Sequence, residues 1–394
     1  MMDVLKTLSK TNSQKEIILG LISSHVDKGE SFALWKVPSS QERHLILSNS
    51  KLTRILDEPL EELDPGFMIA PFHRNGSSYH IKADSHFILD GNKISHLSPT
   101  DNRLLDEKEF SASISGKLKI HKNDFKSNSI PKNRFVELVE KSIKAIAENT
   151  FDKVVPSRCI LMDHLKNDPL QVFDNLCSQH PNAMVSMVSS PETGTWIGAS
   201  PELLVSIDEN QIFKTVSLAG TQLLKEGMNL RSVAWTQKEI EEQAFVSRYI
   251  INCFKQIRLR EFTEHGPKTV QAGNLLHLKT EFEVDMKATN FPQLGSIMIK
   301  LLHPTSAVCG MPHEEASNFL AKNENYDREY YSGFLGPVNI RNCSQLYVNL
   351  RCMQWTHQGV ILYAGAGVTI DSLPEQEWAE TELKIQSLLS SVTL

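Results

Sequence analysis

Two acidic patterns stand out among the residues whose types and spacing could do chemistry. Glu239 and Glu242 are three residues apart near the expected start of one helix, and Glu377 and Glu380 repeat this spacing near the start of another. Residues three apart on a helix share a face, so each pair offers two carboxylates in one direction. Mg²⁺ typically takes one or two protein carboxylates and fills its other positions with water and substrate oxygens. Two such helices could therefore hold a divalent cation between them.

Both acidic pairs also have an ordinary structural interpretation. Exposed acids at this spacing usually form a solvated helix surface. Thr236 followed by Glu239 is a capping-box pattern, in which the carboxylate only caps its own helix, and Ser372 with Glu375 repeats that pattern before the second helix. The occurrence of the same acidic spacing on two helices favours a shared site.

Three further charged residues occupy positions that favour a cleft. Lys153 opens the apolar run KVVPSRCIL, where a lysine shielded from water could serve as a base, although a lysine reaching out to solvent is the alternative. Glu202 follows a Gly-Ala-Ser-Pro turn and precedes an apolar strand, so its carboxyl group could project into a site as an acid. Arg351 lies within the expected strand VNLRCM, where its guanidinium should meet a carboxylate of the protein or of a substrate.

A glycine pair ends an apolar strand near the end of the sequence. Gly365 and Gly367 flank Ala366 directly after the run GVILYA. The backbone amides of such a turn are unhindered and can point at an anion. We therefore expect a cradle for a carboxylate or phosphate here, followed by the helix that carries the second acidic pair and Lys384.

The segments that must position these residues predict an α+β protein. Apolar periodicity predicts helices over residues 12–28, 133–149, 169–178 and 236–257, and another after residue 372. Short β-rich runs fill the intervals, and their hairpin-length gaps favour antiparallel pairing. The polar stretch 90–131 is the best candidate for a linker, or else an ordered surface excursion.

Composition places the chain among soluble globular proteins. Of its 394 residues, 40% are hydrophobic and 22% are charged, as in packed domains. The net charge of −6 argues against binding to nucleic acid or to anionic membranes. No run approaches the length of a membrane span, and no signal peptide is apparent. The six cysteines include no CxxC pair, so a reduced, cytoplasmic location fits best.

A series of segments, taken in order, resembles the chorismate-utilising enzymes, which include isochorismate, salicylate, anthranilate and aminodeoxychorismate synthases. The segments are DKVVPSR, GASPELL, LAGT, KEIEEQ, LLHL, LHPTSAVCGMP, REYYSGFLG, LRC, YAGAG and EWAETELK. The resemblance implies the family's fold, in which two packed, mostly antiparallel sheets with outer helices enclose chorismate and Mg²⁺. Residues 126–394 would form the catalytic domain, and residues 1–125 a strand-rich, variable part of the same fold.

Within this family the resemblance implies an isochorismate synthase. Lys153 would be the base that activates water for attack at carbon 2 of the ring, and Glu202 the acid that protonates the departing hydroxyl at carbon 4. Aminating members lack this lysine, and aminodeoxychorismate synthases carry a nucleophilic lysine where this chain has Ala219. Water is therefore favoured over ammonia. Salicylate synthase, which also eliminates pyruvate, is the alternative, and a non-catalytic chorismate binder is a third hypothesis.

The resemblance implies further roles and partners. Glu242 and Glu380 would bind Mg²⁺, with Glu239 and Glu377 as outer-shell acids. The substrate-binding positions would be Gly220, Thr221, His277, Tyr331, Arg351, Gly365, Ala366, Gly367 and Lys384. Tyr331 with Leu350 looks closest to the menaquinone-type isochorismate synthases. We expect a cytoplasmic monomer without a glutaminase subunit. Departures from the family pattern, at Gln243, Ser306 and Cys309, would affect the shape of the pocket and not the reaction class.

Overall fold

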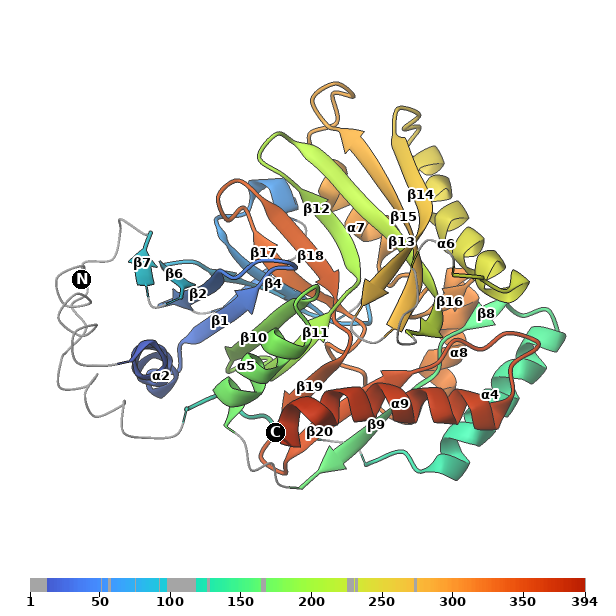
Figure 1. Ribbon diagram of the computed structural model, residues 1–394, viewed down its shortest axis with the longest axis horizontal. Coiled ribbons are helices and arrows are strands. Elements are labelled where there is room, and N and C mark those ends of the chain that lie inside the picture. The colour runs from blue at the N-terminus through green and yellow to red at the C-terminus, as the bar shows by residue number, and fades with distance from the viewer. Residues whose placement is uncertain are drawn as a thin grey trace.

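Two large β-sheets packed face to face form the centre of the protein in the computed structural model (Figure 1). The structure describes residues 13–50, 52–55, 58–74, 76–91, 93–97, 118–125, 128–163, 168–224, 230, 233–272 and 275–393. Within these ranges each large sheet has nine strands, and a small third sheet has two. The strand pairs in both large sheets are antiparallel.

The strands divide between the sheets as follows. In spatial order the first sheet contains β7 (Lys93–His96), β6 (Ser85–Asp90), β2 (Arg43–Ser48), β1 (Ser31–Lys36), β10 (Met184–Ser190), β11 (Gly194–Ser200), β19 (Cys352–Trp355), β20 (Val360–Gly365) and β9 (Ser157–Met162). The second contains β14 (Thr263–Ala272), β15 (Leu275–Asp285), β13 (Ile212–Leu223), β12 (Leu203–Ile207), β18 (Ser344–Val348), β17 (Phe334–Val338), β4 (Gly66–Ala70), β5 (Ser78–Lys82) and β3 (Thr53–Ile55). The small sheet pairs β16 (Gly310–Met311) with β8 (Lys153–Val154).

Helices lie on the outer sides of the sheets (Figure 1). They are α2 (Gln14–Asp27), η1 (Leu60–Glu62), α4 (Lys132–Ala147), α5 (Pro169–Gln179), α6 (Gln237–Gln256), α7 (Leu294–Leu302), α8 (His313–Asn323) and α9 (Pro374–Thr393). Helices α5 and α9 contact the first sheet, while α6 and α7 contact the second. Strands such as β10 are therefore buried along their whole length, because a helix covers one face and the other sheet covers the opposite face.

Apolar side chains from the two sheets meet in a shared core. Trp35 and Ile46 of the first sheet belong to the same buried cluster as Phe67, Leu335 and Tyr347 of the second. One further buried cluster lies between the first sheet and its helices, and another lies between the second sheet and its helices. The predicted architecture of two packed antiparallel sheets with outer helices is confirmed.

The N-terminal strands extend one end of each sheet. Strand β1 pairs with β10 in the first sheet, and β4 pairs with β17 in the second. The polar stretch 90–131 contains β7 and a docked segment in which Leu118 is buried, while residues 98–117 lie outside the described ranges. Strands β1 to β7 thus share both sheets with the rest of the chain.

Of the two predicted capping boxes, one forms and one does not. The backbone N–H of Thr236 donates to the Glu239 carboxylate over 2.7 Å, and the Thr236 hydroxyl caps the start of α6. The hydroxyl of Ser372 instead accepts a hydrogen bond from the backbone N–H of Thr369. Glu375 pairs with a lysine of α4, so tertiary contacts replace the predicted cap of α9.

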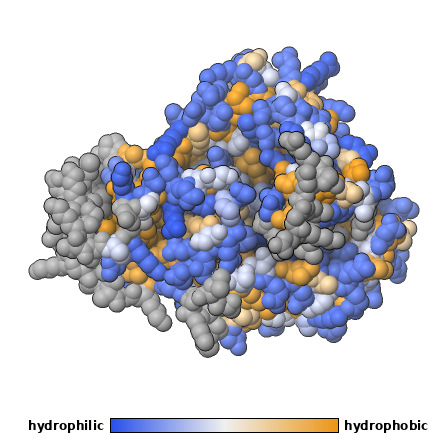
Figure 2. Space-filling view, in the orientation of Figure 1, coloured by the Kyte–Doolittle hydropathy of each residue, from blue (hydrophilic) through white to orange (hydrophobic). Residues whose placement is uncertain are grey.

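Among the described residues, only seven large apolar side chains are exposed. Figure 2 shows a mostly hydrophilic face with small, separate hydrophobic groups. In the part of the chain that the structure describes, no helix combines the length and apolar character needed to cross a membrane.

Candidate active site

Two chain crossings between the sheets carry two of the predicted site residues. Glu202 lies between β11 of the first sheet and β12 of the second, and Arg351 lies between β18 of the second and β19 of the first. The crossings are hydrogen-bonded to each other, since the N–H of Val348 donates to the carbonyl of Glu202 and the N–H of Ala199 to that of Arg351. Arg351 was predicted inside a strand, and this is wrong, because the chain leaves one sheet and enters the other there, with a φ of 46° at Arg351.

A cavity of about 170 Å³ opens beside these crossings. Strands of both sheets, α6 and α9 contribute to its walls. The predicted site residues that line it are Lys153, Glu202, Gly220, Glu242, His277, Tyr331, Arg351, Gly365, Gly367, Glu380 and Lys384. Residues predicted from separate motifs are therefore brought to one place by the fold.

Lys153 enters the cavity from the short strand β8. The predicted single strand is divided by Pro156 into β8, which pairs with β16, and β9, which pairs with β20. The Lys153 side chain is 13% exposed, and its Nζ lies 2.9 Å from Oε1 of Glu242. A Cβ added at Gly367 would lie 3.2 Å from Cε of Lys153, so this glycine leaves the room that the lysine needs.

Glu202 is an acid of the cavity whose pKa is clearly raised by its surroundings. It is only 9% exposed, and burial raises the pKa of its carboxyl group to about 7. The hydroxyl of Thr305 donates to its Oε1 over 3.2 Å, which partly opposes that rise in pKa. Glu202 can therefore hold a proton close to neutral pH and release it to a substrate.

Arg351 presents a cation to the cavity. Burial lowers the pKa of its guanidinium, yet within the described ranges the guanidinium forms no ion pair and no hydrogen bond. Tyr331 lines the same cavity, is 4% exposed, and stacks on Tyr363 with ring centroids 5.1 Å apart. Because no described protein carboxylate neutralises Arg351, an anionic ligand is its natural partner.

His277 and Gly220 form a further part of the wall. The Nδ1 atom of His277 lies 2.9 Å from the carbonyl oxygen of Gly220. Burial lowers the pKa of His277 to about 4, so the ring is neutral at neutral pH. Thr221 follows in β13, but its side chain lies outside the described part of the structure.

One of the amides of the predicted cradle, that of Ala366, already has a partner in the protein. The N–H of Ala366 donates to the carbonyl of Pro156 over 3.1 Å, and Ala366 is fully buried without lining the cavity. The carbonyl of Gly365 accepts a hydrogen bond from Lys384. Pairing with the neighbouring segment thus engages the Ala366 amide, and the glycines leave space beside the cavity: a Cβ at Gly365 would lie 3.2 Å from the hydroxyl oxygen of Tyr331.

A larger cavity of about 660 Å³ adjoins the first and shares Glu242 and Glu380 with it. Glu239 and Glu377 line only this second cavity. Glu239 closes the capping box of α6, so its structural interpretation holds. Glu380 pairs with Lys384 over 2.7 Å.

The carboxylates at this junction suit a divalent cation by their chemistry. Mg²⁺ prefers oxygen ligands and needs only one or two carboxylates from the protein, and Glu242 and Glu380 face both cavities. Their present partners are the ammonium groups of Lys153 and Lys384. Over the described ranges no three acidic, histidine or cysteine side chains are gathered closely enough to form a ligand cluster, so water and substrate oxygens would complete the coordination.

Sequence reasoning missed Thr305 and Tyr363. Thr305 lies in the quoted segment LHPTSAVCGMP, but only the fold shows that its hydroxyl reaches Glu202. Tyr363 lies in the quoted segment YAGAG, but only the fold shows that its ring stacks on that of Tyr331. Among the departures from the family pattern, Ser306 lines the larger cavity, whereas Gln243 is buried between α6 and the second sheet and lines neither cavity.

Comparisons with known proteins agree with this arrangement. A family model described as "Chorismate binding enzyme" matches residues 85–393. Isochorismate synthase EntC of Escherichia coli K12 is 29% identical over 263 residues, which are 65% of this chain and 66% of EntC. The vibriobactin-specific isochorismate synthase of Vibrio cholerae is 31% identical over 201 residues, half of each chain. The matched stretches therefore span less than two thirds of each relative.

The fold has a solved counterpart. The structure of MenF, the menaquinone-specific isochorismate synthase of Escherichia coli, superposes with a TM-score of 0.74 over 97% of this chain and 92% of that one, at 21% identity. At this level of identity the likeness concerns the fold.

Proposed function

Because the chain belongs to the chorismate-binding enzyme family, we propose that it is an isochorismate synthase, which converts chorismate to isochorismate by attack of water at carbon 2 with loss of the hydroxyl group at carbon 4. The observation that carries this proposal is one cavity that contains a candidate base, Lys153, a candidate acid, Glu202, and the cation Arg351. Relatives that share sequence with the chain are named isochorismate synthases.

The cations of the cavity would bind the dianionic substrate. Arg351 can donate two parallel hydrogen bonds to a carboxylate, and burial strengthens this contact by excluding water. Tyr331 is held by its stack on Tyr363 and has its hydroxyl close to Gly365, where it can donate to the same carboxylate. This binding would fix the ring between Lys153 and Glu202, and such positioning lowers the entropic part of the barrier.

In the proposed reaction Lys153 removes a proton from water as the water attacks carbon 2. Glu202 gives its proton to the hydroxyl that leaves carbon 4, and its pKa of about 7 suits this task. Thr305 donates to Oε1 of Glu202 and so orients the carboxyl group. After turnover one proton has moved from water to Lys153 and another from Glu202 to the leaving hydroxyl, so both groups must exchange protons with solvent.

We also propose that the enzyme requires Mg²⁺, held by Glu242 and Glu380 with Glu239 and Glu377 nearby. When bound, the metal would supply positive charge to the ring carboxylate of the substrate. Glu242 would then no longer hold the Lys153 ammonium.

Product analysis tests the proposal directly. Incubating the purified protein with chorismate and Mg²⁺ should give a mixture of chorismate and isochorismate, and isochorismate supplied alone should return the same mixture. Stoichiometric pyruvate and salicylate would identify a salicylate synthase instead. No change in chorismate would indicate a binder without activity.

We further propose a cytoplasmic monomer acting without a glutaminase subunit, in a menaquinone-type pathway.

A further inference from the structure

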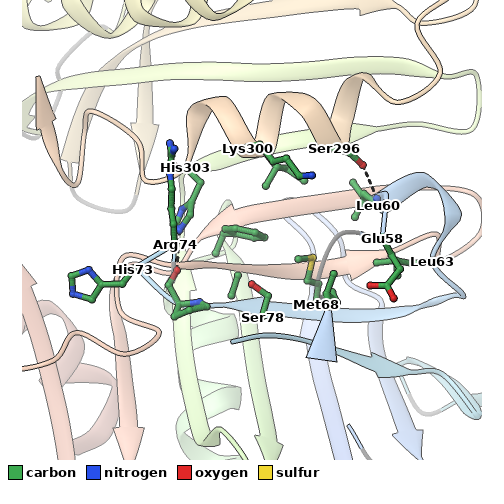
Figure 3. Close-up of a pocket in the computed structure, with 15 residues that line it drawn as sticks. Glu58, Leu60, Leu63, Met68, His73, Arg74, Ser78, Ser296, Lys300 and His303 are labelled. Atoms are coloured by element: carbon green, nitrogen blue, oxygen red, sulfur yellow. Dashed lines mark hydrogen bonds between the residues drawn. The ribbon is translucent and has the colours of Figure 1, made fainter. Parts of the chain in front are cut away.

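A third cavity, of about 330 Å³, lies beneath helix α7 (Figure 3). Helix α7 lies above it in this view, with Lys300 and Ser296, and Met68 and Ser78 from β4 and β5 lie below. It shares none of its described lining residues with the two cavities of the candidate active site. Its volume falls within the range of about 300 to 1,000 Å³ that small-molecule sites occupy.

The deep part of this cavity is apolar. Leu60, Met68, Ala70 and Phe334 line it and are each less than 10% exposed. Ile299 of α7 adds a half-buried side chain. The serine at the top of the cavity is already engaged, because Oγ of Ser296 accepts a hydrogen bond from the backbone N–H of Leu60. A ligand that fills this part must therefore be apolar, and it would gain the contacts that the empty space lacks.

One end of the cavity carries a positive charge. Figure 3 shows Arg74 and His303 together at that end and Glu58 at the other. The Nε of Arg74 donates to the carbonyl of His303 over 2.7 Å, and Nε2 of His303 lies 2.8 Å from the carbonyl oxygen of Pro71. The first of these contacts orients the guanidinium of Arg74, which is otherwise exposed, and among the described residues no carboxylate forms an ion pair with Arg74.

The histidine at this end does not add to the charge. Burial lowers the pKa of His303 to about 4, so its ring is neutral at neutral pH and the positive charge belongs to Arg74. With its Nε already bound, the terminal nitrogens of Arg74 remain able to donate to an anion. Planar pairing of guanidinium with carboxylate is the strongest contact available there.

We propose that this cavity binds a small apolar carboxylate, with its apolar part against Met68 and Phe334 and its carboxylate on Arg74. The proposal does not rest on the reaction proposed for the candidate active site.

Calorimetric titration of the whole protein with benzoate tests this site. The titration is done in an Arg351→Ala background, so that the candidate active site lacks its anion-binding guanidinium. Benzoate should bind at about 1 mM or below, and its neutral isostere benzamide at least tenfold more weakly, because about 1.4 kcal/mol corresponds to a factor of ten and a charge-assisted contact exceeds that. Adding Arg74→Gln should weaken benzoate binding by a similar factor.

Two further variants separate the site from general effects. Arg134→Gln removes an exposed arginine on α4 and should leave benzoate binding unchanged. Ile299→Trp should fill the cavity from the half-buried side of α7 and abolish binding while Arg74 remains. Equal binding of benzoate and benzamide, or benzoate binding that survives both Arg74→Gln and Ile299→Trp in folded protein, would overturn the proposal. Thermal melting of each variant verifies the fold.

Discussion

Lys153 donates a hydrogen bond to Glu242 over 2.9 Å, and this contact joins the short strand β8 to helix α6 inside the cavity. The positive charge of Lys153 is the main reason why the pKa of Glu242 lies below its ordinary value. The candidate base and a candidate metal ligand therefore neutralise each other. A cation that binds Glu242 would release Lys153, so metal binding and base function should be coupled.

Removal of divalent cations should abolish activity. With excess chelator we expect no isochorismate from chorismate, and addition of Mg²⁺ should restore it. Glu242→Gln and Glu380→Gln should lose activity more completely than Glu239→Gln, because Glu239 already caps α6 and lines only the outer cavity. Rates of product formation measure this effect, and full activity in excess chelator would exclude the metal assignment.

Replacing Arg351 with alanine should weaken substrate binding without unfolding the protein. The lost charge-assisted contact is worth on the order of 2 to 3 kcal/mol, which corresponds to a rise in KM of about thirtyfold or more. Arg341→Ala, at an exposed position before β18, is the matched control. If Arg351→Ala instead lowers the melting temperature and leaves KM unchanged, Arg351 stabilises the fold and does not bind substrate.

The forward rate should fall as the pH rises through about 7. Burial raises the pKa of Glu202 to about 7, so the acid is protonated below this pH and loses its proton above it. The basic limb of the profile of kcat against pH should disappear in Glu202→Gln, whose residual rate should be lower by about a hundredfold or more. A basic limb that persists in this variant would belong to another group.

The hydrogen bond from Thr305 provides a second check on the same limb. It stabilises the ionised form of Glu202 and so lowers the pKa of that carboxyl group. Thr305→Val should therefore move the basic limb of kcat to higher pH while the limb keeps its shape. Profiles of wild type and variant measured in the same buffers make the comparison, and an unchanged or lowered limb would contradict the role given to Thr305.

Lys153→Ala should remove the attack by water and leave the fold intact, since the lysine contributes a proton acceptor and not a core contact. A high concentration of ammonia at alkaline pH could then supply its own nucleophile. We expect a weak aminated product in this variant only if Glu202 is retained, and no product from the double variant. Chromatography of the products decides the matter, and near-normal isochorismate formation by Lys153→Ala would refute the base assignment.

Local patterns were sufficient where the interacting residues are close in sequence. The capping box of Thr236 and Glu239 forms as predicted, because both partners lie on one helical turn. Alternation and turn spacing indicated antiparallel strands, and helical periodicity located α4, α5 and α6 to within a few residues. The resemblance carried by the ordered motifs likewise indicated which charged side chains belong to one site.

Tertiary structure decided every feature that depends on partners distant in sequence. Lys153 and its partner Glu242 are 89 residues apart in the sequence. The N–H of Ala366 likewise donates to the carbonyl of Pro156, which is distant in sequence. Neither contact leaves a local signal. Arg351 reads as a strand residue, but the crossing between the sheets places it in the cavity without a described protein carboxylate to pair with. The pKa of Glu202 likewise follows from burial between the two sheets. The sequence by itself determined which groups are available, and the packing of two sheets determined their solvation and partners.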